Sequence, residues 1–206
     1  MRFHALVGAA ILSLALPAIA SIQQNAPRMP LAHRALLLDI ATAGDRLVAA
    51  GEHGIILYSD DNGKNWQQAG VPTQQMLTGI HFADPKLGWT VGHDGLILFS
   101  DDGGKNWRIQ RDGLAVQQQV NIESREVAHH NLSNLQQQLK AADDESRPAL
   151  ELALEDAELD LEDADIALEE PVFTSPFMDV WFQDGNTGWA AGAFGTFVGT
   201  TDGGQH

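Results

Sequence analysis

Cysteine is missing from this 206-residue chain, so neither a disulfide framework nor a lipid-anchored cysteine is available to it. Basic residues are also scarce: 12 Lys and Arg face 28 Asp and Glu, which gives a formal net charge of −16. Such a charge argues against nucleic acids and anionic membrane surfaces as partners. No nucleophile elbow, phosphate-binding loop or zinc spacing occurs. We therefore expect no metal site, no cofactor and no small-molecule substrate.

A long apolar run is missing as well. The stretch Ala5–Leu16 is shorter than the roughly 20 residues of a transmembrane helix. It follows Arg2 and precedes the small-residue site Ala18–Ala20, an order that is typical of a secretory signal peptide. We expect residues 1–20 to be removed near Ala20, and the mature chain to be periplasmic or secreted rather than membrane-spanning. A buried N-terminal helix is the alternative.

The chain does contain a repeated turn motif, Ser/Thr-x-Asp-x-Gly-x-x-Trp, which is called the Asp box here. It occurs at Ser59–Trp66 and Ser100–Trp107, and Thr200–His206 matches it up to the tryptophan. A motif that recurs in this way indicates a repeat architecture rather than a single active site. The residues that define the three boxes are Ser59, Asp61, Gly63, Trp66, Ser100, Asp102, Gly104, Trp107, Thr200, Asp202 and Gly204.

The boxes keep a fixed register once an insertion is allowed. The first two begin 41 residues apart, and at that offset Gly51 falls on Gly92 and Gly54 on Gly95. The second and third begin 100 residues apart, which aligns Gly92 with Gly192. A period of about 40 to 45 residues with four short strands is typical of β-propeller blades. The longer interval therefore contains an insertion.

Within each unit the sequence predicts a hairpin. Gly88–Gly92 and Gly95–Ser100 are apolar runs joined by a short Gly-x-x-Gly turn. We predict a mainly β fold, a partial β-propeller of about three four-stranded blades, the last one incomplete. Residues 21–35 form a linker, 36–113 the first two blades and 171–206 the third. Because propellers carry about 4 to 8 blades, the sequence is interpreted as part of a longer protein or as the product of a truncated gene.

The box residues are expected to build the turn itself. Ser100 and Asp102 can hydrogen-bond to backbone groups of their own turn. Gly104 permits a backbone conformation that a Cβ resists, and Trp107 supplies apolar area between adjacent sheets. The paired acids could bind a metal instead, but the loop lacks the acid-rich pattern and the closing glutamate of a calcium hand.

The insertion, residues 114–170, contains no glycine and predicts an antiparallel α-helical hairpin, roughly 116–142 and 147–169. Leucine and alanine recur there at spacings of three and four, which is the spacing of a heptad seam. The seam positions are Ala128, Leu132, Leu135, Leu139 and Ala142 in the first helix and Leu150, Leu154, Ala157, Leu161, Ala164 and Leu168 in the second.

Further expectations concern the second helix of this hairpin. Leu152, Leu159 and Ile166 flank its seam and are expected to widen the apolar face, and Ser146 is expected to be its N-cap. The helix is also acidic, since 13 of the 28 Asp and Glu lie within residues 143–170. A solvated face, an arm that docks a basic partner and a metal site are the three interpretations.

Propeller topology predicts where this hairpin emerges. Asp-box turns join the third and fourth strands of a blade, whereas Gly-x-x-Gly turns join the second and third. The two kinds of turn therefore lie at opposite ends of a blade, and an insertion after a fourth strand leaves from the Gly-x-x-Gly end. Loops on one face of a rigid scaffold commonly carry function, which makes Glu52, His53, His93, Asp94 and Phe194 the candidate partner-binding face.

The boxes, the Gly-Trp strands at Gly88–Gly92 and Gly188–Gly192 and the export signal together resemble one family. The chain is similar, over 36–113 and 177–206, to the photosystem II assembly and stability factors and their bacterial relatives, which are Asp-box (BNR) propellers. The resemblance implies a non-catalytic, exported assembly or scaffolding factor for a membrane-protein complex. The acidic hairpin departs from the plant and cyanobacterial pattern, and the basic patch of photosynthetic members has no counterpart here.

Two functions remain open. The first is a protein-binding module whose partner is an exported protein or a membrane protein. The second is a sialidase-like glycoside hydrolase whose catalytic residues lie outside this sequence. Such an enzyme needs an arginine cluster and a tyrosine nucleophile, whereas Tyr58 is the single tyrosine here and precedes a box, where packing explains it better.

Overall fold

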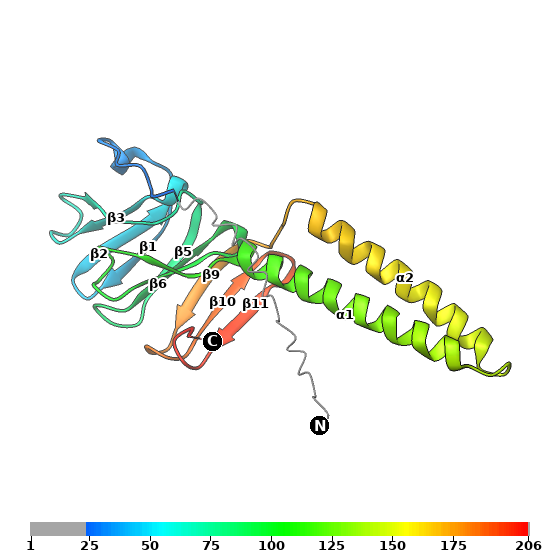
Figure 1. Cartoon of the computed structure of the whole chain (residues 1–206). Coiled ribbons are helices and arrows are strands. Elements are labelled where there is room, and N and C mark those ends of the chain that lie inside the picture. Colours follow the sequence, from blue (N-terminus) through cyan, green and yellow to red (C-terminus); the bar gives the residue numbers. More distant parts are fainter. Residues whose placement is uncertain (1–23, 206) are drawn as a thin grey trace, which may run out of the picture.

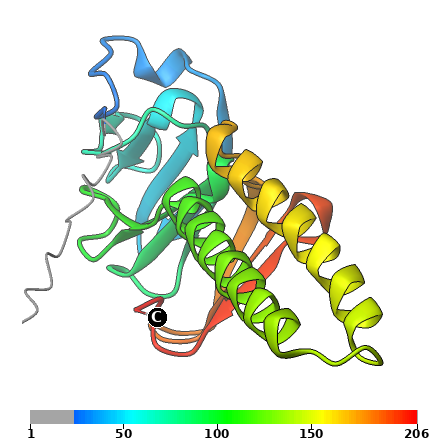
Figure 2. The ribbon, with the colours of Figure 1, turned by 45° about the vertical axis from the view of Figure 1, so that its right-hand side comes forward.

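The computed structural model describes residues 24–205, so the expected signal peptide lies outside the described residues. The described chain has two parts: sheets that stand side by side, and a long helical hairpin that projects from them (Figure 1). A rotated view shows the two helices running together away from the sheets (Figure 2). None of the described helices is long and apolar enough to cross a membrane.

The strands form three antiparallel sheets, each of which is one blade. Blade 1 consists of β1 (Leu37–Ala43), β2 (Arg46–Gly51), β3 (Ile56–Ser59) and β4 (Gln67–Gln68). Blade 2 consists of β5 (Leu77–Phe82), β6 (Gly88–Gly92), β7 (Ile97–Ser100) and β8 (Arg108–Arg111). Blade 3 has three strands within the described residues, β9 (Phe177–Phe182), β10 (Gly188–Gly192) and β11 (Phe197–Thr200). The predicted partial propeller with an incomplete third blade is confirmed.

The first strands of the three blades, β1, β5 and β9, lie next to one another. Hydrogen bonds join them directly across the blade boundaries. The Asp39 carboxylate accepts from the backbone N–H of Ile80 at 2.8 Å, and the Thr78 hydroxyl donates to the carbonyl of Phe177 at 2.6 Å. Adjacent blades are therefore held in register by polar contacts as well as by apolar packing.

The apolar core lies between the blades. Between blades 1 and 2, Trp107 and Phe82 of blade 2 pack edge-on with ring centroids 5.9 Å apart, in a cluster that includes Val48 of blade 1. Between blades 2 and 3, Trp89 stacks on Phe182 with centroids 3.6 Å apart. Burial of these large aromatic surfaces is the main favourable contribution to blade stacking.

A short 3-10 helix, η1 (Ala32–Arg34), lies within the segment interpreted as a linker. Ala32 is buried there against Ile55 and Leu57 of blade 1. This segment therefore covers part of the blade 1 face that is turned away from blade 2.

The hairpin consists of α1 (Gly113–Ala141) and α2 (Arg147–Glu169). Helix α1 begins three residues before the expected start because Asp112 caps it, accepting from the backbone N–H of Ala115 at 3.2 Å. Ser146 is the N-cap residue of α2, as expected, although a capping side chain usually accepts a backbone N–H of the first turn. Ser146 makes no such bond and donates instead to the Asp143 carboxylate, which also accepts the Ser146 backbone N–H at 2.9 Å.

The seam residues of both helices face the partner helix and are buried or half-buried. Polar contacts support the pairing: the Asn121 amide donates to the carbonyl of Ala167 at 3.0 Å, and Arg125 pairs with Asp165 at 2.5 Å. One expectation is wrong. The side chains of Leu152, Leu159 and Ile166 do not widen the buried face; these residues are 61%, 59% and 45% exposed. Each lies two residues beyond a seam position, about 200° around the helix, and so lies off the seam.

Candidate functional site

The Asp-box turns use their polar side chains internally. In the second box the Ser100 hydroxyl oxygen accepts from the N–H of Gly104 at 3.0 Å. The Asp102 carboxylate accepts from the N–H groups of Lys105 and Asn106, both at 3.0 Å. The first box repeats this arrangement with Ser59 and Asp61, and the third with Thr200 and Asp202. The box carboxylates are therefore occupied by their own turns.

These hydrogen bonds also set the charge of the box carboxylate. Burial raises the pKa of Asp102, but the hydrogen bonds from Asn106, Ser100 and Lys105 outweigh burial and hold the pKa below its usual value. Hydrogen bonds from Asn65 lower the pKa of Asp61 in the same way. Within residues 24–205, no group of three or more His, Cys, Asp or Glu side chains is arranged to hold a metal ion.

At the other end of each blade the Gly-x-x-Gly turn joins the second strand to the third. The first glycine is needed because the incoming chain passes very close: a Cβ on Gly51 would lie 2.0 Å from the carbonyl oxygen of Leu36. A Cβ on Gly92 would lie 2.1 Å from the carbonyl oxygen of Met76. The same repeated contact carries a backbone hydrogen bond, for example from the N–H of His93 to Met76 at 3.0 Å.

The residue before the second glycine has a left-handed backbone in all three turns. The φ angles are 53° at His53, 58° at Asp94 and 56° at Phe194. This conformation is costly for a bulky side chain, and such strain is concentrated at functional sites. Phe194 is also 86% exposed. One of these left-handed residues is therefore a highly exposed aromatic one.

The structure places all five residues of the candidate face in these turns. They differ in their partners. Glu52 accepts the backbone N–H of Leu36 at 2.8 Å and lies 3.7 Å from the ring nitrogen of His53. The Asp94 carboxylate accepts from the Gln75 side chain. Two of the five thus organise the turn or the chain that enters the blade.

The hairpin leaves from this same end of the blade stack. A Cβ on Gly95, in the turn of blade 2, would lie 3.3 Å from the Cα of Gly113 and 3.1 Å from the hydroxyl of Thr174. Gly113 begins α1, and Thr174 lies in the segment that follows α2. Both ends of the insertion therefore meet at one Gly-x-x-Gly turn.

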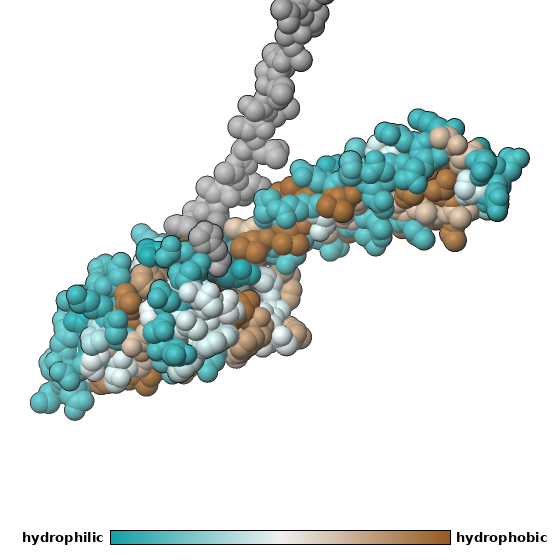
Figure 3. All heavy atoms as spheres, turned by 90° about the horizontal axis from the view of Figure 1, so that it is seen from below, coloured by the Kyte–Doolittle hydropathy of each residue, from teal (hydrophilic) through white to brown (hydrophobic). Residues whose placement is uncertain are grey.

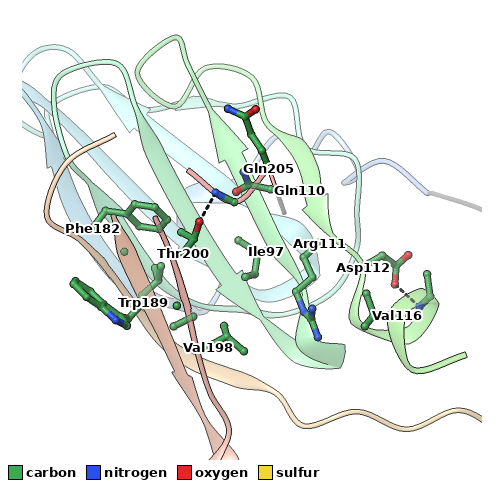
Figure 4. Close-up of a pocket in the computed structure, with 16 residues that line it drawn as sticks. Ile97, Gln110, Arg111, Asp112, Val116, Phe182, Trp189, Val198, Thr200 and Gln205 are labelled. Carbon is green, nitrogen blue, oxygen red and sulfur yellow. Dashed lines mark hydrogen bonds between the residues drawn. The ribbon is translucent and has the colours of Figure 1, made fainter. Parts of the chain in front are cut away.

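A crevice of about 390 Å³ lies between blades 2 and 3 (Figure 4). Phe182, Trp189 and Val198 line it from blade 3, and Gln110 and Arg111 line it from β8. Gln110 accepts from the indole of Trp89 at 3.0 Å, and Arg111 has a buried Nε without a hydrogen-bond partner among the described residues. Sequence reasoning missed this crevice because it depends on how two blades stack.

The equivalent space between blades 1 and 2 is filled by a tryptophan side chain. There Trp107 is 6% exposed and its indole N–H donates to the carbonyl of Gly104 at 3.1 Å. Phe82, which packs on Trp107, is the repeat equivalent of Phe182 in the crevice. The crevice is therefore a packing position of the blade repeat.

Tyr58 and Arg46 contact one another on blade 1. The Tyr58 hydroxyl donates to Gln67 at 3.1 Å, and the Arg46 guanidinium lies 4.9 Å from the centroid of the tyrosine ring. Arg46 also pairs with Asp60 at 2.6 Å and donates to the carbonyl of Gly103 in blade 2. These contacts link two adjacent blades.

The fold and the turns define this chain as a set of Asp-box β-propeller blades that carries a helical hairpin. Residues 64–134 match the family described as photosynthesis system II assembly factor YCF48. The match runs from the first box through blade 2 and into α1. The similarity to the photosystem II assembly factors that the sequence predicts is confirmed.

A solved structure described as YCF48 bound to D1 peptide is also similar. The match has a TM-score of 0.50 at 13% sequence identity and covers 84% of this chain. It covers 39% of the other chain, so this sequence spans well under half of that protein's length. At this identity the likeness shows the fold. No curated protein matches the chain.

Proposed function

We propose that this protein is an exported, non-catalytic propeller that binds a protein partner and serves as an assembly or scaffolding factor for a membrane-associated complex. One observation carries the proposal. The hairpin and the Gly-x-x-Gly turns with left-handed residues lie at one end of the blade stack. At the other end, the polar side chains of the boxes are hydrogen-bonded to the backbone of their own turns.

The chemistry of that end supports a protein partner. Phe194 presents a large exposed ring on a rigid turn, and aromatic anchors of this kind dominate binding energy in protein interfaces. The hairpin beside it is strongly acidic, which steers basic partners and repels acidic ones. The partner is an exported protein or the exported domain of a membrane protein.

The comparisons support the same class of function. The family matched by residues 64–134 is one of assembly factors, and the similar structure is described as bound to a peptide. A peptide segment of a membrane protein is a suitable ligand for the Gly-x-x-Gly end. The acidic hairpin favours a partner other than a photosystem subunit.

Site-specific photo-cross-linking tests the proposal. A photoreactive residue is placed at His93 or Phe194 on the proposed face, and at Lys64 or Lys105 in the exposed box turns as matched controls. In the envelope fraction of the source cells we expect discrete protein adducts from His93 and Phe194 and none from the box positions. Adducts of equal yield from both ends would contradict the proposal.

A further inference from the structure

Helix α2 carries two apolar stripes instead of one. The first is the seam that packs on α1. The second, named here the outer stripe, consists of Leu152, Leu159 and Ile166, which are spaced by seven residues and are exposed on the far side of the helix. Apolar side chains interrupt the polar surface of the hairpin (Figure 3). A helix that is packed on one side only is expected to be polar on the other.

Acidic residues border the outer stripe at regular positions. Three and four residues after each stripe position the side chain is Asp or Glu, and these positions are neighbours of the stripe on the helix surface. The bordering residues are Glu155, Asp156, Glu162, Asp163, Glu169 and Glu170. The pattern of one apolar and two acidic residues thus repeats every seven residues along α2, and its last acidic residue, Glu170, is the C-cap of the helix.

The basic residues of the hairpin do not neutralise this border. Arg125 pairs with Asp165, which is not one of the bordering acids. Lys140 and Arg147 lie near the connection between the helices, at the far tip of the hairpin. The outer stripe is therefore an apolar track about 21 Å long, from the helical rise over 14 residues, between two acidic rows.

Three kinds of partner could cover the outer stripe, and the acidic rows beside it favour one of them. A second copy of the hairpin would bring acidic rows against acidic rows, which is unfavourable. An anionic lipid surface would be repelled by the same rows. A helix with one apolar side and flanking Lys or Arg would match both the stripe and its border.

We propose that the outer stripe docks a basic amphipathic helix of the partner. Its apolar residues contact Leu152, Leu159 and Ile166, and its flanking Lys and Arg pair with the acidic rows. The inference rests on the proposed function, because it assigns the partner's chemistry at the hairpin. It adds a second contact to the one made by the Gly-x-x-Gly end.

The test uses the whole chain and a synthetic probe. The probe is a 21-residue peptide with Leu at heptad positions a and d and Lys or Arg at e and g, a pattern that follows coiled-coil pairing. A scrambled peptide of identical composition has the same charge without an apolar side. The protein variants are the triple change Leu152→Gln, Leu159→Gln and Ile166→Gln, and the matched control Val127→Gln, an exposed apolar residue of α1.

Titration calorimetry should show that the patterned peptide binds at least tenfold more tightly than the scrambled one. The triple variant should lose at least tenfold in affinity, and Val127→Gln should bind as the parent does. Equal binding of both peptides, or undiminished binding by the triple variant, would show attraction by charge alone and overturn the proposal. If circular dichroism shows loss of helix in the triple variant, Leu159→Gln alone supplies the same comparison. Cross-links from His93 and Phe194 would survive such a failure, so the two proposals fail separately.

Discussion

At the residue scale, the Asp-box carboxylate has a structural role. Asp102 accepts two backbone N–H groups and the Asn106 side chain, so its charge is satisfied within its own turn. The neighbouring Asp101 is exposed, whereas Asp102 is half-buried. Substituting each of these two aspartates in turn therefore measures how much the hydrogen bonds of the box stabilise the fold.

The first prediction concerns stability. Asp102→Ala should lower the free energy of unfolding by about 1 to 3 kcal/mol, because the backbone donors of the turn lose a charged acceptor. Asp101→Ala should change it by less than about 0.5 kcal/mol. Urea unfolding followed by tryptophan fluorescence measures both. Equal effects of the two changes would show that the hydrogen bonds of Asp102 do not stabilise the folded chain.

The second prediction concerns pH. Because the pKa of Asp102 is lowered in the folded chain, its stabilising contribution is present above the unfolded-state pKa of about 3.9 and is lost as the pH falls through the lowered value. The stability difference between the parent and Asp102→Asn should therefore be largest at neutral pH and shrink below about pH 4. Unfolding curves recorded from pH 7 to pH 2 test this. A difference that stays constant to pH 2 would be evidence against an ionised acceptor.

At this scale, the roles of single residues could be predicted from the sequence where a motif is repeated. The boxes recur at fixed offsets, so Asp102 and Gly95 could be assigned to turns without a structure. The left-handed φ of Phe194 could not, because nothing in the local sequence distinguishes its turn from a relaxed one. The outward direction of Leu159 was accessible from its position two residues beyond a seam residue.

At the scale of elements, the hairpin is held by one buried seam, and the residues of its outer stripe are largely exposed. Element type and the start of α2 were predictable from periodicity and from Pro148 in the first turn. The start of α1 was not, because it depends on a cap by Asp112, the residue between β8 and α1. The crevice was also beyond prediction, since its walls come from two blades.

Two leucines of α2 test whether the seam, and not the outer stripe, stabilises the hairpin. Leu161→Ala on the seam should destabilise the hairpin by about 2 kcal/mol, since it leaves a cavity at the helix interface. Leu159→Ala on the outer stripe should cost under about 0.5 kcal/mol, since its side chain is exposed. Hydrogen exchange of amides in α1 and α2 reports the local stability. A larger loss of protection from Leu159→Ala would place the wrong face against α1.

At the scale of the whole molecule, the hairpin is an appendage whose two ends meet at Gly95. The blades have their own cores, which consist of residues outside the insertion. We therefore expect that the hairpin can be removed and the gap bridged by a short linker without separating the blades. That separability allows the fold and the binding function to be measured independently.

Capture of the partner by a chain that lacks residues 114–170, joined through a short Gly-Ser linker, tests the central claim most directly. The deletion variant should keep the β-sheet circular dichroism and the cooperative unfolding of the blades. It should no longer retain the protein that cross-links to His93 and Phe194 in the parent chain. Capture by the parent should weaken as rising salt shortens the screening length below about 10 Å. Undiminished, salt-independent capture by the folded deletion variant would contradict the account.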